Sequence, residues 1–256
     1  MRERYAKAIY TRRMRKGLTL AEAQDQMSRK LRFAGMMVRE GDADAMVAGI
    51  ESNYPETIRP ALQVVGKADG VDHVAGLYMI ALPNRKLLFF ADTSVNIEPD
   101  SEILAEIAIL SAGFVRELKI EPRVAMLSFS NFGSAPHAFS KKMADAVQRV
   151  KDLDPTLEVD GEMQADWALN NEMLKEHFPF SDLNGPANIL VFPNLGAANT
   201  AYKLMDVIGG ADVIGPILLG MRRPVHVLQR GSTVQDVVNL ITIASVDAAE
   251  RGRVQG

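Results

Sequence analysis

The stretch Gly215-Pro-Ile-Leu-Leu-Gly-Met-Arg-Arg-Pro-Val-His-Val-Leu-Gln-Arg-Gly-Ser-Thr-Val-Gln-Asp236 carries the pattern from which the fold is predicted. Its apolar run, bounded by glycine and proline, indicates a buried strand, and a basic loop then leads to a second short strand. The following turn carries Arg230, and Thr233 is placed to cap a helix that begins at Val234. Backbone N–H groups at a helix start beside a guanidinium can bind an anion. Many α/β proteins have such a turn without a ligand, so the pattern alone favours a plain surface loop, and the anion site is the alternative.

The composition is that of an ordinary globular protein. The chain has 256 residues, of which 47% are hydrophobic and 24% charged, with a net charge of −3. This balance does not favour binding to nucleic acid or to an anionic membrane. No apolar run approaches the roughly 20 residues that span a bilayer, and the N-terminus lacks a signal-peptide core.

Cysteine and histidine usage excludes several kinds of site. The absence of cysteine rules out disulfides, thiolate zinc sites and cysteine nucleophiles, and it fits a cytoplasmic protein. The four histidines are isolated and lack the spacing of metal ligands, so no metal site is predicted from them.

Apolar segments with strand character alternate with segments of helical periodicity along the whole chain. Strands are predicted at 44–49, 74–82, 86–91, 124–130, 157–160, 187–193 and 213–219, and helices at 20–41, from 56, and at 101–118, 137–151, 197–208 and 233–251. Residues 83–85 are expected to form a hairpin connection, and Pro136 to occupy a first helical position. This alternation predicts an α/β fold around a mostly parallel sheet.

Polar clusters follow the ends of the predicted strands. They are Ser52-Asn53 with Arg59, Asp92-Thr93-Ser94, Ser128 to Ser134, Asn194 to Asn199 with Lys203, and Arg230 with Asp236. Arg59 is expected near a helix N-terminus, where the dipole disfavours a cation, which hints at an anionic partner. Because α/β folds bind ligands at the carboxyl ends of their strands, the five clusters are expected to converge on one sheet edge.

A group of carboxylates follows the strand predicted at 157–160. Asp160, Glu162 and Asp166 lie close enough in sequence to hold a hard cation. Acidic residues beside a helix start also serve as partners of the helix dipole, and we favour that interpretation.

Several motifs, in order along the chain, resemble the phosphate acetyltransferase family. They are Asp44-Ala-Met-Val-Ala-Gly49, Arg59-Pro-Ala-Leu-Gln63, Phe90-Ala-Asp92, Ala105-Glu-Ile-Ala108, Glu121-Pro-Arg-Val-Ala-Met-Leu-Ser128, Asp160-Gly-Glu162, Tyr202-Lys203, Gly215-Pro-Ile-Leu218 and Arg230-Gly231. Finer details resemble the acetyltransferase-like C-terminal domain of bifunctional NADP-dependent malic enzymes. These details are Ala91-Asp-Thr93, Ser130-Asn-Phe-Gly-Ser134, Asp160-Gly-Glu-Met163 and Val191-Phe-Pro-Asn194 with Ala197-Ala-Asn199.

The resemblance implies a fold of two α/β subdomains around a cleft, similar to isocitrate and isopropylmalate dehydrogenases, and a homodimer. On this basis residues 1–70 and 210–256 are expected to form the first subdomain and residues 71–209 the second. The chain begins partway into the family's usual length, so the first subdomain is expected to be N-terminally truncated.

The resemblance also assigns roles to residues. It implies that Arg13 and Arg59 face phosphates of coenzyme A, and that Ser128, Ser130, Ser134, Asn199 and Lys203 line the cleft. In an active transferase, Arg230 would hold the acyl carbonyl or phosphate and Asp236 would accept the proton of the coenzyme A thiol. A thiol that attacks acetyl phosphate needs such a base and a cation on the developing oxyanion.

Two positions depart from the family pattern. Gln229 stands where active enzymes have serine, and Thr93 stands where they often have cysteine. The first departure replaces a hydroxyl expected to touch the transferring group by a bulkier amide. The favoured hypothesis is therefore an acetyl-CoA-binding regulatory domain of a malic enzyme, with an active phosphate acetyltransferase and a dimerisation scaffold with a vestigial cleft as alternatives.

Cofactors and partners follow from the favoured hypothesis. Acetyl-CoA or CoA would be the ligand of this chain, which would need no cofactor of its own. NADP and a divalent metal would belong to a separate malic enzyme catalytic domain, which would be the protein partner.

Overall fold

The computed structural model describes residues 1–254 and divides the chain into two compact units. Unit 1 consists of Met1–Gly70 and Met221–Gly256, and unit 2 consists of Val71–Gly220. Residues 210–220 were predicted to lie in the first subdomain, but they belong to unit 2 because they contain β7 (Asp212–Leu219), a strand of its sheet. None of the helices within residues 1–254 has the length and apolar character needed to cross a membrane.

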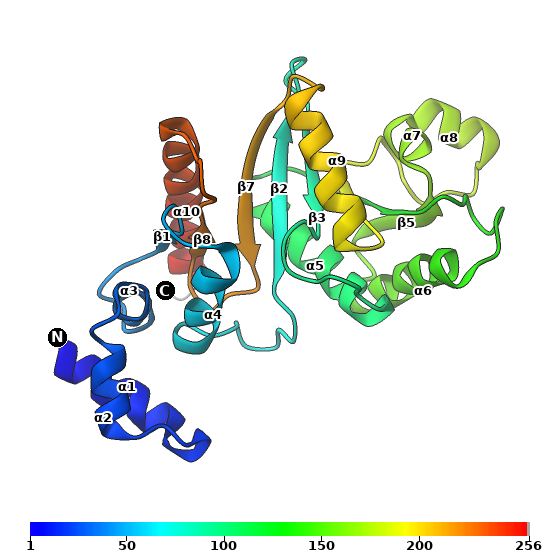
Figure 1. Ribbon diagram of the computed structural model, residues 1–256. Helices are drawn as coiled ribbons and strands as arrows, with labels where there is room; N and C mark the ends of the chain where they lie inside the picture. The colour runs from blue at the N-terminus through cyan, green and yellow to red at the C-terminus, as the bar shows by residue number, and fades with distance from the viewer. Residues whose placement is uncertain (255–256) are drawn as a thin grey trace. The chain divides into compact units, whose positions relative to one another are not determined.

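Unit 2 is built on a six-stranded sheet of order β5-β4-β6-β3-β2-β7, seen in Figure 1. Its strands are β2 (Ala75–Ala81), β3 (Leu87–Ala91), β4 (Arg123–Leu127), β5 (Glu158–Met163), β6 (Ile189–Val191) and β7 (Asp212–Leu219). Its helices are α5 (Ser101–Glu117), α6 (Ala138–Leu153), α7 (Ala165–Leu169), α8 (Asn171–His177) and α9 (Leu195–Val207).

The sheet of unit 2 is mixed. Strands β5, β4, β6 and β3 run parallel to one another, as predicted, whereas β2 is antiparallel to both β3 and β7. The β2–β3 hairpin confirms the predicted connection at residues 83–85. Because parallel strands end at the same edge, the loops that follow β3, β4, β5 and β6 leave the sheet on one side.

Alternation along the strands divides the core of unit 2 between the two sheet faces. Tyr78 and Ile80 of β2 are buried in one cluster with residues of α7, α8 and α9, and the ring of Tyr78 stacks on Tyr202 with centroids 4.1 Å apart. Leu77 of β2 and Phe89 of β3 are fully buried and point to the opposite face, because successive side chains of a strand alternate. The six strands therefore carry helices on both faces.

Unit 1 is mainly helical and contains a two-stranded parallel sheet. Its elements are α1 (Arg2–Arg13), η1 (Met14–Lys16), α2 (Leu20–Gln26), α3 (Lys30–Arg39), β1 (Met46–Ala48), α4 (Tyr54–Val64), β8 (Val225–Val227) and α10 (Val234–Val254), as Figure 1 shows. Tyr5, Ile9 and Met36 anchor a core that joins α1, α2, α3 and α4. The loops after β1 and β8 leave the same edge of the small sheet.

The predicted helix starts are confirmed where the capping residue lies within a few positions of the groups it caps. Thr19 and Glu22 form the predicted capping box of α2, and Asp100 accepts hydrogen bonds from the first turn of α5. Pro136 does not open α6 as expected, because His137 is the N-cap and accepts a hydrogen bond from Phe139 N.

The single helix expected over residues 20–41 is wrong, because it is broken between Gln26 and Lys30. Ser28 ends the first helix by donating hydrogen bonds from its N and its Oγ to Asp25 O, at 2.9 and 2.6 Å. Arg29 then adopts an extended conformation and starts the second helix. Serine competes for backbone hydrogen bonds in this way, which favours helix ends.

Candidate functional site

The serine loop, residues 128–134, connects the carboxyl end of β4 to the segment before α6. Ser130 is fully buried, donates from Oγ to Glu162 Oε1 at 2.7 Å and accepts from Ala135 N at 3.0 Å. Ser134 is exposed, and its Oγ accepts from Asn131 N at 2.9 Å. The half-buried Ser128 donates its N–H to Met163 O at 2.8 Å. Ser134 and Ser128 therefore retain accessible surface, whereas the hydroxyl of Ser130 serves the loop itself.

Glu162 on β5 fixes the conformation of the serine loop. Its buried Oε1 accepts from Gly133 N at 2.8 Å as well as from Ser130, and its carbonyl accepts from Phe132 N at 2.8 Å. From the sequence, Glu162 was predicted to be a cation ligand or a partner of the helix dipole, and this role in the loop was not predicted. The signal that points to it is the Asp160-Gly-Glu162 motif, which lies on the strand paired with β4.

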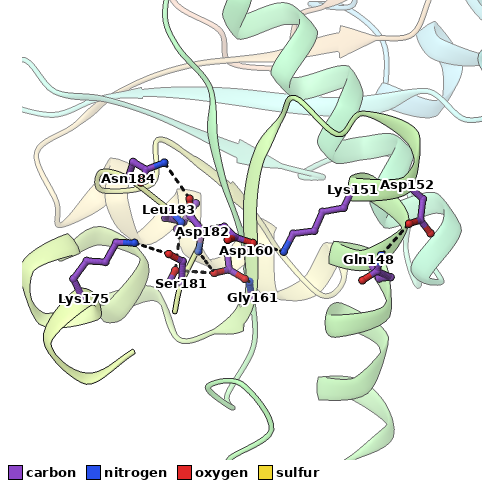
Figure 2. A network of polar contacts seen from close by, with 10 residues as sticks. All are labelled: Gln148, Lys151, Asp152, Asp160, Gly161, Lys175, Ser181, Asp182, Leu183 and Asn184. Carbon is purple, nitrogen blue, oxygen red and sulfur yellow. Dashed lines mark hydrogen bonds and ion pairs between the residues drawn. The ribbon is translucent and has the colours of Figure 1, made fainter. Parts of the chain in front are cut away.

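Asp160 is also committed to structure, as Figure 2 shows. Its Oδ2 accepts from Ser181 Oγ at 2.7 Å and from Asp182 N at 2.8 Å, and its Oδ1 accepts from Gly161 N at 2.9 Å. Lys151 of α6 pairs with Asp182 at 2.5 Å. This network attaches the loop after α8 to β5 and α6. Asp166 lies apart in the first turn of α7, and residues 1–254 contain no group of three His, Cys, Asp or Glu side chains that could hold a metal.

Asp92 organises the loop that follows β3. Its Oδ1 accepts from the backbone N–H groups of Gly76 (3.0 Å), Ser94 (2.9 Å) and Val95 (3.1 Å), and its Oδ2 accepts from Asn96 N at 2.8 Å. Burial raises the pKa of Asp92, and these N–H donors act in the opposite direction because they stabilise the carboxylate. The cluster predicted at residues 92–94 is thus a rigid turn rather than a set of available side chains.

Asn199 and Lys203 lie one turn apart on α9, which starts at the same sheet edge as the serine loop. Asn194 caps this helix by accepting from Ala197 N at 2.9 Å. Asn199 is half-buried and Lys203 is exposed, with its Nζ 5.2 Å from the centroid of the Tyr202 ring. The parallel order of β3, β6 and β4 therefore brings three of the five predicted clusters to one edge of unit 2.

The remaining two clusters belong to unit 1. Arg230 is exposed on the turn after β8, where Gln229 N donates to Ser232 Oγ at 3.1 Å. Asp236 closes a capping box at the start of α10: its Oδ2 accepts from Thr233 N at 2.7 Å and from Thr233 Oγ1 at 2.9 Å, while Asp236 N donates to Thr233 Oγ1 at 3.2 Å. Asp236 therefore has a structural function that the sequence analysis did not foresee, and its Oδ2 is already engaged.

The turns that precede α4 and α10 are held together by close backbone packing. Leu228 N donates to Ala48 O at 2.8 Å, and Gly49 has a φ of +128°. A Cβ at Gly49 would lie 2.5 Å from Leu228 O, so only glycine permits this approach. The loop that leads into α4, the helix of Arg59, and the turn that carries Arg230 thus start side by side at one edge of the small sheet.

Arg59 and Arg13 are connected through α4. The helix begins at Tyr54, so Arg59 is its sixth residue and lies beyond the first turn, where the dipole argument made from the sequence no longer applies. Arg59 is exposed, and Arg13 Nη1 donates to Gln63 O at 3.2 Å, one turn further along the helix. Within residues 1–254, neither Arg13, Arg59 nor Arg230 forms an ion pair with a carboxylate.

Unit 1 thus carries exposed guanidinium groups, and unit 2, described by itself, carries hydroxyl, amide and ammonium groups at one edge of its sheet. Such groups suit a phosphorylated, hydrogen-bonding ligand, as in acyl-transfer proteins that handle phosphate. The phosphate acetyl/butaryl transferase family matches residues 1–245, and the chain belongs to this family.

Two curated relatives illustrate the similarity. The chain is 40% identical over 256 residues to the phosphate acetyltransferase of Clostridium acetobutylicum, covering 98% of this chain and 77% of that protein. It is 42% identical over 236 residues to the NADP-dependent malic enzyme of Escherichia coli K12, covering 91% of this chain and 31% of that protein. Both kinds of protein to which the motifs pointed are therefore relatives.

The fold matches solved structures of the family. The phosphotransacetylase from Streptococcus pyogenes superimposes with a TM-score of 0.89 and 36% identity, covering 98% of this chain and 75% of that one. The predicted α/β class and the resemblance to phosphate acetyltransferases are both confirmed.

Proposed function

We propose that this chain binds acetyl-CoA through a phosphate acetyltransferase-type site and acts as the acetyl-CoA-sensing part of a malic enzyme, with little transfer activity of its own. Arg13 and Arg59 would bind phosphates of the ligand. Ser128, Ser134, Asn199 and Lys203 would contribute polar contacts. Ser130 would act indirectly, since its hydroxyl is committed to Glu162.

The observation that carries this proposal is the pair of exposed arginines Arg59 and Arg230. They stand on loops and helices that leave one edge of the small sheet, and no carboxylate of residues 1–254 pairs with either. Unpaired guanidinium groups favour phosphate through charge-assisted, often bidentate hydrogen bonds. The 42% identity to a malic enzyme over most of the chain supports the regulatory part.

The binding step is tested by titrating acetyl-CoA into the wild-type chain and into Arg59→Gln. We expect the variant to bind about tenfold more weakly, because one charge-assisted hydrogen bond is lost. Arg2→Gln, at the far end of α1, is the matched control and should bind like wild type. Equal affinity of all three chains would contradict the assignment of Arg59. An absence of saturable binding in the wild type would favour the dimerisation scaffold.

A second candidate is active phosphate acetyl transfer, favoured by the presence of both Arg230 and Asp236. Asp236 Oδ2 is engaged by Thr233, but Oδ1 has no hydrogen-bond partner within the described residues, so one carboxylate oxygen remains to accept a thiol proton. Gln229 is the residue that would weaken this reaction.

Transfer is measured as release of thiol from acetyl-CoA plus phosphate with a thiol-reactive dye, to which this cysteine-free chain adds no background. Steady phosphate-dependent release would establish transfer and refute the purely regulatory function. If release occurs, Asp236→Asn should abolish it while keeping an oxygen for the helix cap. Thr233→Ala removes the cap partner but leaves the carboxylate, and it should retain the activity.

The location and assembly of the protein stay predictions. The absence of cysteine suits the cytoplasm. A homodimer follows from the family resemblance and is tested by light scattering of the purified chain. NADP and a divalent metal would bind to a separate malate-oxidising domain.

A further inference from the structure

Lys142 of α6 connects two loops that leave the carboxyl edge of the unit 2 sheet. Its Nζ donates a hydrogen bond to Pro99 O at 2.9 Å, in the loop after β3, and another to Pro193 O at 2.8 Å, directly after β6. The side chain is half-buried. Among residues 1–254, no carboxylate forms an ion pair with this ammonium, so its hydrogen bonds go to backbone carbonyls alone.

Both of these carbonyls belong to residues that directly precede a helix cap. Pro99 precedes Asp100, which caps α5, and Pro193 precedes Asn194, which caps α9. The long side chain of a helical residue points toward the N-terminus of its helix, which lets Lys142 reach both loops from the second turn of α6. Lys142 therefore joins the starts of α5 and α9, two helices that are far apart in sequence.

The position of Lys142 Nζ is unfavourable for a cation. Peptide dipoles make the N-terminus of a helix positive, and the two carbonyls lie beside the N-termini of α5 and α9. A half-buried ammonium also loses part of its hydration, here without an ion pair that would offset the loss. A cation in such a place indicates that its two hydrogen bonds do more than add to general stability.

Helix α9 carries two polar residues of the proposed site. Asn199 and Lys203 lie one turn apart, and Tyr202 between them stacks on Tyr78 of β2. The body of α9 is thus attached to the sheet through Tyr202, whereas its first turn is attached through the loop that Lys142 contacts. Because a helix moves as a stiff element, a shift of its start would displace Asn199 and Lys203 together.

We propose that Lys142 is a positioning residue, which fixes the first turn of α9 relative to the start of α5 and thereby places Asn199 and Lys203. The consequence for a ligand rests on the proposed function, in which these two residues contact acetyl-CoA. The fixing of α9 concerns unit 2 alone and does not depend on that function. The two parts are therefore tested by separate measurements.

Three variants separate the hydrogen bonds of Lys142 from its bulk. Lys142→Met keeps a long unbranched side chain but donates no hydrogen bond, and Lys142→Arg keeps the charge and several donors. Lys141→Met is the matched control, because Lys141 is the preceding residue of α6 and is exposed. Within the described residues, Lys141 pairs only with Asp145, at 2.8 and 2.9 Å.

The first measurement is amide hydrogen exchange at the start of α9. Leu195 N donates to Ile97 O at 3.1 Å, and Ala197 N donates to Asn194 Oδ1 at 2.9 Å. In Lys142→Met these two amides should exchange about tenfold faster than in Lys141→Met, while those of β4 stay unchanged. Lys142→Arg should restore most of the protection.

Two results of the exchange measurement would overturn the proposal. One is equal exchange of Leu195 and Ala197 in Lys142→Met and Lys141→Met, which would mean that Lys142 does not hold the start of α9. The other is an equal acceleration in β4, because Lys142 would then act only on the stability of unit 2 as a whole.

The second measurement is a double-mutant cycle with Lys203→Gln, followed by titration of acetyl-CoA. If Lys142 acts through α9, Lys142→Met should weaken binding about fivefold in the wild-type background and much less in the Lys203→Gln background. Lys141→Met should bind like wild type. Equal losses in both backgrounds would refute the connection of Lys142 to the ligand. If the wild type does not bind acetyl-CoA, the proposed function fails, and hydrogen exchange alone decides whether Lys142 positions α9.

Discussion

Polar side chains have opposite functions in the serine loop of unit 2 and in the basic helices of unit 1, by which we mean α1, α2 and α3 with their connections. Around Ser130, the hydroxyl donates to Glu162, whose Oε1 also accepts a hydrogen bond from the backbone amide of Gly133. Around Arg32, the donors meet only amide oxygens and the positive charge is left unbalanced. The first arrangement fixes the shape of a loop, whereas the second leaves charge available to a ligand.

This difference distinguishes side chains that hold the backbone in place from side chains that can bind a ligand. A buried polar network stabilises one conformation only when all its members are satisfied. An exposed cation without a partner contributes little to the fold and much to the attraction of an anion. We therefore expect substitutions in the serine loop network to act on stability and substitutions of Arg13 or Arg59 to act on ligand affinity.

The largest expected effect is that of Glu162→Ala. The change leaves the buried hydroxyl of Ser130 and the N–H of Gly133 without their acceptor, which should lower the free energy of unfolding by about 3 kcal/mol. Urea denaturation measures this loss, with Glu176→Ala on the exposed surface of α8 as control. A loss no greater than that of the control would mean that Glu162 does not hold the loop.

The second largest effect is the pH dependence of stability that the buried His226 of β8 contributes. Burial, and then the charge of Arg251, lowers the pKa of His226 to about 4. Asp247 lies beside it, with Oδ2 3.7 Å from His226 Nε2. Because the pKa is depressed in the folded state, the neutral histidine stabilises the fold above its unfolded pKa of about 6.5, and this stability is lost as pH falls toward 4.

Lowering the pH from 7 to 5 should, through protonation of His226 in the unfolded state, decrease the free energy of unfolding by about 2 kcal/mol. Burial raises the pKa of Asp247, which acts in the opposite direction over part of this range. His226→Gln isolates the histidine, since it removes only the imidazole titration. Chemical denaturation at both pH values is the measurement. An equal pH dependence in the variant and the wild type would show that His226 does not titrate in this range.

The smallest expected effect is that of Arg29→Gln. Both partners of the Arg29–Asp25 pair are about 64% exposed, and such pairs contribute at most about 0.5 kcal/mol. Thermal unfolding should therefore be nearly unchanged. Repeating it at high salt gives the control, because screening should remove what remains of the interaction. A loss above about 1 kcal/mol would mean that the basic helices, like the serine loop, depend on their polar contacts for stability.

Much of this protein can be predicted from the sequence, since the relevant signals are local. The cap at Thr19, the cap at Asp100 and the hairpin at residues 83–85 involve groups a few positions apart, so their residue types suffice. The motifs from Asp44 to Gly231 sufficed for the family as well. The break between α2 and α3 was missed because an apolar helical spacing continues across Ser28, whose hydrogen bonds to Asp25 override it.

Only the tertiary structure decided which polar groups are committed and which are available. Ser130 and Glu162 are 32 residues apart and meet because β4 and β5 pair in parallel, whereas Arg32 and Gln63 are 31 apart and meet where α3 packs on α4. The assignment of residues 210–220 likewise depended on strand pairing with β2. Sequence spacing reports hydrogen bonds that close within about one helical turn or one hairpin, but it does not report which distant segments come together, because that choice is made by packing of the whole core.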